Sequence, residues 1–191
     1  MMISKEVLDA ALKPGTRMLI DDCAEKLKGA SIDWPSLDLT AQQLNILELM
    51  ENGLLPGVTG FMRPEVALTA LDNEDDLVAA DGLTLDISSE LAEIFATRLD
   101  DGELWVSLRD REGVMLAVLV VSEVREMSNG THVVAGDVYG LEFPRHYDFA
   151  ELRYNFLDNA LENSGAAVTV FVNGPLHTEH LDMIRSVSAD K

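Results

Sequence analysis

The residues best suited to chemistry are two histidines near the end of the sequence, His177 and His180. They lie three positions apart, so both imidazoles would share one face of a helix. This spacing suits half of a metal site. A third ligand is not obvious, because Glu179 would point to another side of the helix, and His132 and His146 lie in other segments. We therefore predict no metal site.

A second group with chemical potential is the positive cluster of Arg145, His146 and Arg153 in an otherwise acidic sequence. Such a cluster could bind an anion. Its charges could equally pair with the neighbouring carboxylates of Asp148 and Glu151. We favour this ordinary pairing.

The elements that would position the two histidines follow a recognisable order. A helix is predicted over 149–163, a continuous apolar strand over 168–172, a glycine loop at Gly174-Pro175, and a further helix over 176–186. A helix, a buried strand, a glycine loop and a helix are typical of the opening of an α/β nucleotide-binding domain.

The N-terminal third is predicted to be helical. Apolar spacing favours a helix over 5–12, and Thr16 is expected to cap a second helix that runs to 27. The stretch 31–39 reads as a loop. Thr40 and Gln43 form a capping-box pattern that opens a helix ended by Asn52-Gly53, and a short helix is predicted over 64–71.

The middle of the chain is predicted to be mostly β, with small helices attached. Period-two or continuous apolar patterns indicate strands over 83–87, 104–108, 114–124 and 132–139, and residues 109–113 suggest a hairpin turn. The acidic stretch 72–81 lacks the ligand spacing of a calcium site, so we interpret it as a solvated loop.

Composition limits the classes of partner. The 191 residues include 34 Asp and Glu against 14 Lys and Arg, for a net charge of −20. This charge would repel a phosphate backbone, so we expect no nucleic-acid partner. The sequence has neither a signal-peptide pattern nor an apolar run long enough to span a bilayer, so we expect no membrane association and a cytoplasmic location. The single Cys23 is expected to be buried and unreactive.

Three colinear stretches resemble the ATP sulfurylase family. The first is Trp-Pro-Ser-Leu-Asp-Leu-Thr at 34–40 with the later segments 47–49, 52–53 and 60–62. The second is Leu-Thr-Leu-Asp-Ile-Ser at 83–88 with 108–110 and 112–114. The third is Pro-Arg-His-Tyr-Asp-Phe at 144–149 with 151–153.

The resemblance implies an α+β fold with two parts. Residues 1–145 would form a PUA-like β-barrel domain with peripheral helices. Residues 146–191 would form the start of an α/β, nucleotidyltransferase-like unit, truncated after its first strand and loop. Trp34, Phe61, Trp105 and Tyr139 are expected in the core or its seams rather than in a ligand cage.

The family's sulfate and nucleotide motif is Gln-x-Arg-Asn-Pro-x-His-x-x-His, and it aligns with 171–180. Pro175, His177 and His180 match, whereas the Gln is Phe171 here, and the Arg and Asn are Asn173 and Gly174. The resemblance therefore implies a residual nucleotide-binding set made of His177, His180, Asn173 and Gly174. It identifies no catalytic residue, because the family's later motifs would lie beyond Lys191.

The expected function is an ATP-sulfurylase-like protein that is not catalytic alone and has a binding, assembly or regulatory role in sulfate activation. The alternative is a subunit of an active sulfate adenylyltransferase that is completed in trans. We expect no resident cofactor, with ATP or adenylyl sulfate as the ligands to test. The expected partners are a second copy of the chain or a separate catalytic subunit.

Overall fold

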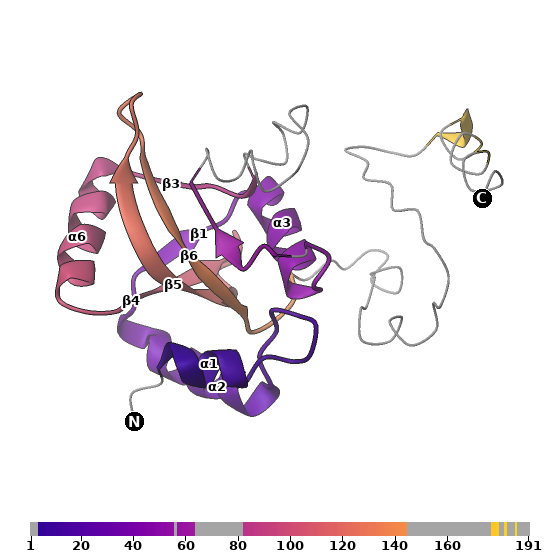
Figure 1. Cartoon of the computed structure of the whole chain (residues 1–191), viewed down its shortest axis with the longest axis horizontal. Coiled ribbons are helices and arrows are strands. Elements are labelled where there is room, and N and C mark those ends of the chain that lie inside the picture. Colours follow the sequence, from indigo (N-terminus) through magenta and orange to yellow (C-terminus); the bar gives the residue numbers. More distant parts are fainter. Residues whose placement is uncertain are drawn as a thin grey trace. The chain divides into compact units, whose positions relative to one another are not determined.

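The computed structural model describes residues 4–55, 57–63 and 82–144, and beyond these only residues 177–179, 182 and 186. The chain divides into two compact units, Met1–Phe156 and Leu157–Lys191. All the helices and strands labelled in Figure 1 belong to the first unit. The elements predicted over 64–71, 72–81, 149–163 and 168–172 lie outside the described residues, as does most of 176–186.

A six-stranded sheet forms the centre of this unit (Figure 1). Its order is β1 (Ser36–Asp38), β4 (Leu104–Arg109), β5 (Met115–Glu126), β6 (His132–Gly140) and β2 (Gly60–Phe61), and β3 (Leu85–Ile87) also pairs with β6. β1 and β4 are parallel, whereas the other pairs are antiparallel. The four predicted strands and the hairpin between β4 and β5 are confirmed.

Both faces of the sheet are covered, which explains the apolar run in β5. Leu119 and Val121 face one core cluster, while Val118 and Val120 face the other. A strand that is buried on two sides needs apolar residues at successive positions, since successive side chains point to opposite faces. The apolar run therefore belongs to β5, a strand in the middle of the sheet.

Helices supply the outer layer of each core. α3 (Ala41–Glu51) and α6 (Ser89–Asp100) contribute to the first cluster, and α1 (Lys5–Ala10) and α2 (Asp21–Ala30) contribute to the second. The capping box of α3 is confirmed: the backbone N–H of Gln43 donates to the Thr40 hydroxyl, and the Thr40 N–H donates to the Gln43 side chain.

The prediction for the second helix was wrong at its start. α2 begins at Asp21, and residues 16–20 are not helical. Leu19 bridges Leu12, and Met18 bridges Gly140 of β6. These bridges hold the segment against the sheet, so long-range pairing outweighs the local capping signal of Thr16.

Two further elements were not predicted. The stretch 31–39 contains a short 3-10 helix, η1 (Ser31–Asp33), and β1, rather than only a loop. α6 was missed altogether, although Ser88 accepts a hydrogen bond from the Leu91 N–H at its N-cap. The mixed α and β character holds, whereas the nucleotidyltransferase-like unit predicted at 146–191 lies outside the residues that the structure describes in any detail.

Two glycines allow the closest approaches in the sheet. A Cβ added to Gly136 would overlap the carbonyl oxygen of Val120 on β5, and a Cβ added to Gly60 would overlap that of Gly136. Both obstacles are backbone atoms, which cannot move aside as a flexible side chain can. Beside Gly136, the β5–β6 register shifts between Val121 and Glu123.

We predict that Gly136→Ala destabilises the domain by about 1–3 kcal/mol, because the new methyl group overpacks the sheet. Gly29→Ala is the matched control. Gly29 lies in α2 with no atom within 4 Å of an added Cβ, so alanine there should stabilise by about 0.5–1 kcal/mol. Urea unfolding monitored by circular dichroism measures both changes. Equal stabilities of the two variants would contradict this account of the sheet.

Candidate functional site

The structure leaves the predicted nucleotide-binding set largely untested. His177 is described and exposed, whereas Asn173, Gly174 and His180 lie outside the described residues. The same holds for Arg145, His146 and Arg153. The role of these residues therefore stays a prediction.

Within the first unit, the most prominent polar cluster lies where α1 meets β6. Lys5 Nζ forms an ion pair with Asp137 Oδ2 at 2.5 Å, and the Thr59 hydroxyl donates to Asp137 Oδ1 at 2.5 Å. Two residues further along β6, the Tyr139 hydroxyl donates to Asp9 Oδ1 at 2.7 Å. These bonds join α1 and the segment before β2 to the same strand.

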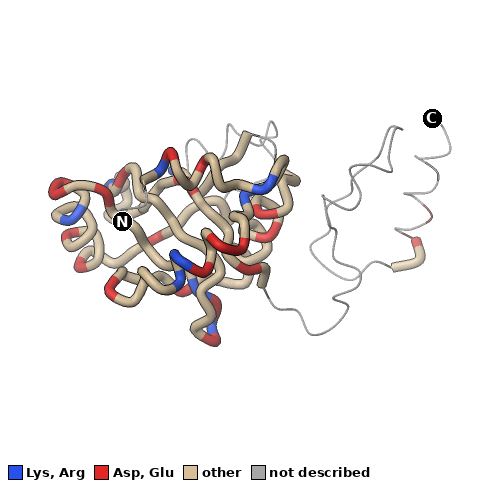
Figure 2. Tube along the Cα trace, turned by 90° about the horizontal axis from the view of Figure 1, so that it is seen from below, with Lys and Arg blue, Asp and Glu red and all other residues tan. Residues whose placement is uncertain are grey.

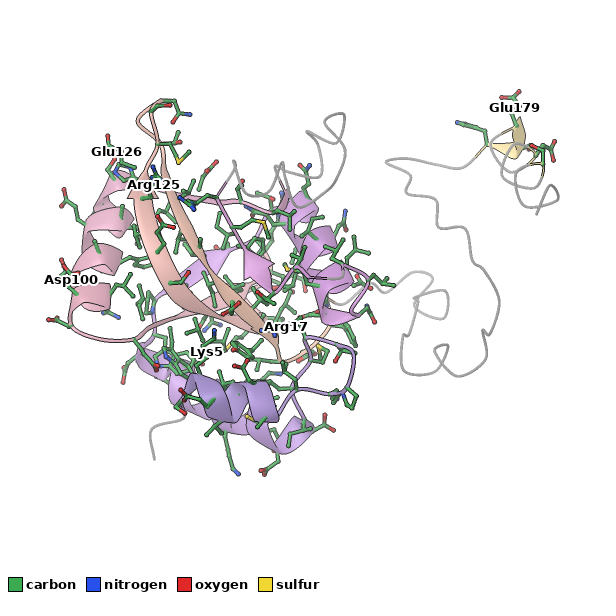
Figure 3. The ribbon with its side chains drawn as sticks, in the orientation of Figure 1. Lys5, Arg17, Asp100, Arg125, Glu126 and Glu179 are labelled. Carbon is green, nitrogen blue, oxygen red and sulfur yellow. The ribbon has the colours of Figure 1, made fainter. Side chains whose placement is uncertain are left out.

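Arg17 belongs to the same cluster, and Figure 3 labels it together with Lys5. Its Nε donates to the carbonyl oxygen of Val138 at 2.9 Å, and its guanidinium stacks 4.6 Å from the centre of the Tyr139 ring. Its Nη2 is buried and has no hydrogen-bond partner among the described residues. The backbone N–H of Arg17 also donates to the carbonyl oxygen of Glu51. The Glu51 residue is fully buried.

The pKa values in the cluster follow from these contacts. Its hydrogen bond to Asp137 raises the pKa of Lys5 above the ordinary value. Burial pushes the pKa of Asp137 upward, but the bonds from Lys5 and Thr59 outweigh burial and hold it below its usual range. Burial, followed by the bond to Asp9, raises the pKa of Tyr139.

This cluster does not have the character of an anion site or a reaction centre. Each cation has a carboxylate or a ring against it, and Asp9 and Asp137 would repel a sulfate or phosphate group. The cluster instead fastens α1 to the sheet. No group of His, Cys, Asp and Glu that could hold a metal ion occurs in the described part of the chain.

A shallow, open pocket of about 190 Å³ adjoins the cluster, between β2 and the β5–β6 bulge. Its charged groups are also paired, because Arg63 lies 3.4 Å from Glu123, and Asp137 is held by Lys5 and Thr59. The lining residues are Thr59, Gly60, Phe61, Met62, Arg63, Ser122, Ala135, Gly136 and Asp137. This pocket offers no concentrated charge to a nucleotide.

The aromatic residues lie in or against the core, as predicted, and the burial predicted for Cys23 is confirmed. Trp34 and Trp105 meet edge to face with ring centres 5.2 Å apart, and Phe61 and Tyr139 are buried. Cys23 is also buried in the second core cluster. Burial is the main cause that raises its pKa, with a smaller contribution from Asp22.

The family of PUA-like domains matches residues 13–153. The chain therefore belongs to the PUA-like domain family. Among the described residues, no helix is long and apolar enough to cross a membrane.

The relatives narrow this class to ATP-sulfurylase-like proteins, as the sequence motifs indicate. The sulfate adenylyltransferase of Candida albicans is 26% identical over 82% of this chain and 37% of its own length. That of Kluyveromyces lactis is 26% identical over 79% of this chain and 35% of its own length. The chain thus spans little more than a third of these curated relatives.

A solved structure is also similar to this chain. The hexameric APS kinase from Thiobacillus denitrificans superposes with a TM-score of 0.54 and 30% identity, covering 73% of this chain and 28% of that one. The similarity therefore relates this chain to proteins of sulfate activation.

We predict that Asp137→Asn destabilises the domain by about 1 kcal/mol at pH 7, because the charge-assisted bonds from Lys5 and Thr59 are weakened. A carboxyl with a lowered folded pKa stabilises above its unfolded pKa and loses that contribution as the pH falls through the folded value. The difference between wild type and variant should therefore close as the pH falls below about 4, the ordinary pKa of an Asp carboxyl.

Urea unfolding across this pH range measures the effect. Asp86→Asn, at an exposed position of β3, is the control and should leave stability within about 0.5 kcal/mol of wild type. An Asp137→Asn variant as stable as wild type at pH 7 would show that the charged bonds of Asp137 to Lys5 and Thr59 do not contribute to the free energy of unfolding.

Proposed function

We propose that this chain is an ATP-sulfurylase-related PUA-like module that serves assembly or regulation in sulfate activation and does not transfer adenylyl groups on its own. One observation carries the proposal. Where the family has Gln and Arg in its sulfate and nucleotide motif, this chain has Phe171 and Asn173. Sulfate is a weak nucleophile, and planar donors such as a guanidinium hold it in place. Phe171 has no donor, and Asn173 has no charge.

The electrostatics of the described domain support the same proposal. Adenylyl transfer must hold two polyanions and stabilise the negative charge that develops as pyrophosphate leaves. A site for this reaction needs an excess of positive groups. Lys5, Arg17 and Arg63 instead lie beside carboxylates or an aromatic ring, and the net charge is −20.

A second candidate function is a subunit of a sulfate adenylyltransferase that joins ATP and sulfate into adenylyl sulfate and pyrophosphate. It is favoured by the match at Pro175, His177 and His180. The second chain would be a further copy or a separate catalytic subunit. The solved relative is described as hexameric, which makes assembly with other chains a natural property to test.

We expect the purified chain to release no pyrophosphate from ATP in a sulfate-dependent manner, because the donors that hold sulfate are missing. The measurement is a coupled pyrophosphate assay with and without sulfate, with the Candida albicans sulfate adenylyltransferase as the positive control. Sulfate-dependent release by this chain that falls to background in His177→Ala would refute the leading proposal. Activity that depends on the oligomer, tested across protein concentration, would support completion in trans.

A further inference from the structure

Two Asn-Gly pairs lie in the described part of the chain, in opposite surroundings. Asn52-Gly53 follows α3, and Asn52 is buried. Asn129-Gly130 lies in the turn between β5 and β6 and is exposed. The hairpin that carries this turn projects at the top of the view in Figure 1. In an Asn-Gly pair the backbone nitrogen of the glycine can attack the side-chain amide of the asparagine, because glycine has no Cβ to obstruct the approach.

The turn folds the Asn129 side chain back toward the main chain. Its Oδ1 accepts a hydrogen bond from the Thr131 N–H at 3.0 Å and another from the Thr131 hydroxyl at 2.7 Å. The bond to the N–H closes an Asx turn, a hydrogen-bonded ring that contains the Gly130 nitrogen. This ring keeps the side-chain carbonyl carbon of Asn129 close to the nitrogen that can attack it. No described atom lies within 4 Å of a Cβ added to Gly130, so the approach is open.

The two donors of Thr131 also favour the attack electronically. Negative charge develops on Asn129 Oδ1 when the Gly130 nitrogen adds to the carbonyl carbon. Hydrogen-bond donors that already point at such an oxygen stabilise this charge, as in an oxyanion hole.

The surroundings of Asn52 oppose the same reaction. Its Nδ2, which would have to leave, donates to the carbonyl oxygen of Glu48 at 3.0 Å. The main chain at Gly53 is tightly packed, because an added Cβ would overlap the carbonyl oxygen of Gly15. Asn52 is therefore an internal control with the same dipeptide.

One feature is common to both sites. The Gly130 N–H donates to the Met127 carbonyl at 2.9 Å, and the Gly53 N–H donates to the Met50 carbonyl at 3.0 Å. Either bond must open before the nitrogen can attack. Opening costs less free energy at an exposed hairpin tip than at a buried helix end.

We propose that Asn129 is a site of spontaneous deamidation in the folded protein, promoted by Thr131. The Gly130 nitrogen forms a bond to Asn129 Cγ, and the Cγ–Nδ2 bond breaks. Nδ2 takes up the proton lost by the Gly130 amide and leaves as ammonia. Water then opens the resulting succinimide at one of its two carbonyl carbons, which yields aspartate or isoaspartate at position 129. Water is the only co-reactant.

The modification changes both the charge and the backbone of the hairpin tip. It adds a carboxylate to a chain with a net charge of −20, whose acidic residues are already spread around the first unit in Figure 2. The isoaspartate product also places an extra methylene group in the main chain, which is incompatible with the Asx turn. This inference goes beyond the proposed function and does not rest on it.

The test incubates the purified, full-length chain at mildly alkaline pH for several weeks. Proteolysis at acidic pH followed by tandem mass spectrometry then measures the fraction of each asparagine that has been converted. We expect Asn129 to be converted at least about tenfold faster than Asn52, because only the hairpin tip is exposed and open. In concentrated urea the two sites should be converted at similar rates, since the fold no longer distinguishes them.

Two variants test the role of Thr131, which is itself exposed. Thr131→Val removes the hydroxyl donor and should slow conversion of Asn129 about two- to tenfold, as expected for one neutral hydrogen bond. Thr131→Ser retains the hydroxyl and should stay near the wild-type rate. Circular dichroism checks that both variants are folded.

The proposal is overturned if Asn129 keeps its amide, if it is converted no faster than Asn52 in the folded chain, or if its lead over Asn52 persists unchanged in urea. Equal rates for Thr131→Val and Thr131→Ser would overturn the part assigned to Thr131. Because these readouts involve neither ATP nor sulfate, their failure would leave the proposed function standing, and failure of the pyrophosphate assay would leave them intact.

Discussion

The domain depends on the β5–β6 ladder, which is buried on both faces. This ladder places one core cluster under α3 and α6 and the other under α1 and α2. Because every other strand pairs with β5, β6 or β4, the helices acquire their positions from these central strands. The close approaches at Gly60 and Gly136 show how little space the ladder leaves for side chains.

The second constraint is electrostatic. An acidic chain must place its few cations where they contribute most, and three of them lie near β6. Lys5 holds Asp137, Arg17 covers Tyr139 and binds the Val138 carbonyl, and Lys28 pairs with Glu142 just beyond the strand. Pairing of this kind strengthens the fold and leaves little positive potential for a polyanionic substrate. The fold and the proposed non-catalytic role thus share one physical cause.

The sequence predicted those elements whose signals are local. The capping-box pattern of Thr40 and Gln43 predicts the start of α3, and the apolar run at 114–121 predicts β5. β1 escaped prediction because Ser36–Asp38 gains its strand character only by pairing with Ser107–Arg109, far along the chain. α6 escaped because its apolar positions, Leu91, Ala92, Phe95 and Leu99, lie between two strand patterns and begin with a single Ser88 cap rather than a capping box.

The same reasoning applies to the polar cluster. The pairs Lys5–Asp137 and Asp9–Tyr139 join residues from opposite ends of the domain, and no local pattern connects such partners. The one available signal was the excess of acid, which makes every cation a candidate for pairing with a carboxylate. The motif at 171–180 differs from the polar cluster, because a family pattern in the sequence identifies its residues. Among the predicted nucleotide-binding set, the structure describes only His177.

The proposed function describes this chain as a PUA-like module related to sulfate activation, in which Phe171 and Asn173 stand where the family has the Gln and Arg of its sulfate and nucleotide motif. Calorimetric titration of the purified chain with adenylyl sulfate tests this claim most directly, because the product occupies the sulfate and nucleotide positions together. The account predicts no heat beyond dilution at micromolar ligand. Saturable binding that is abolished by His177→Ala would contradict it.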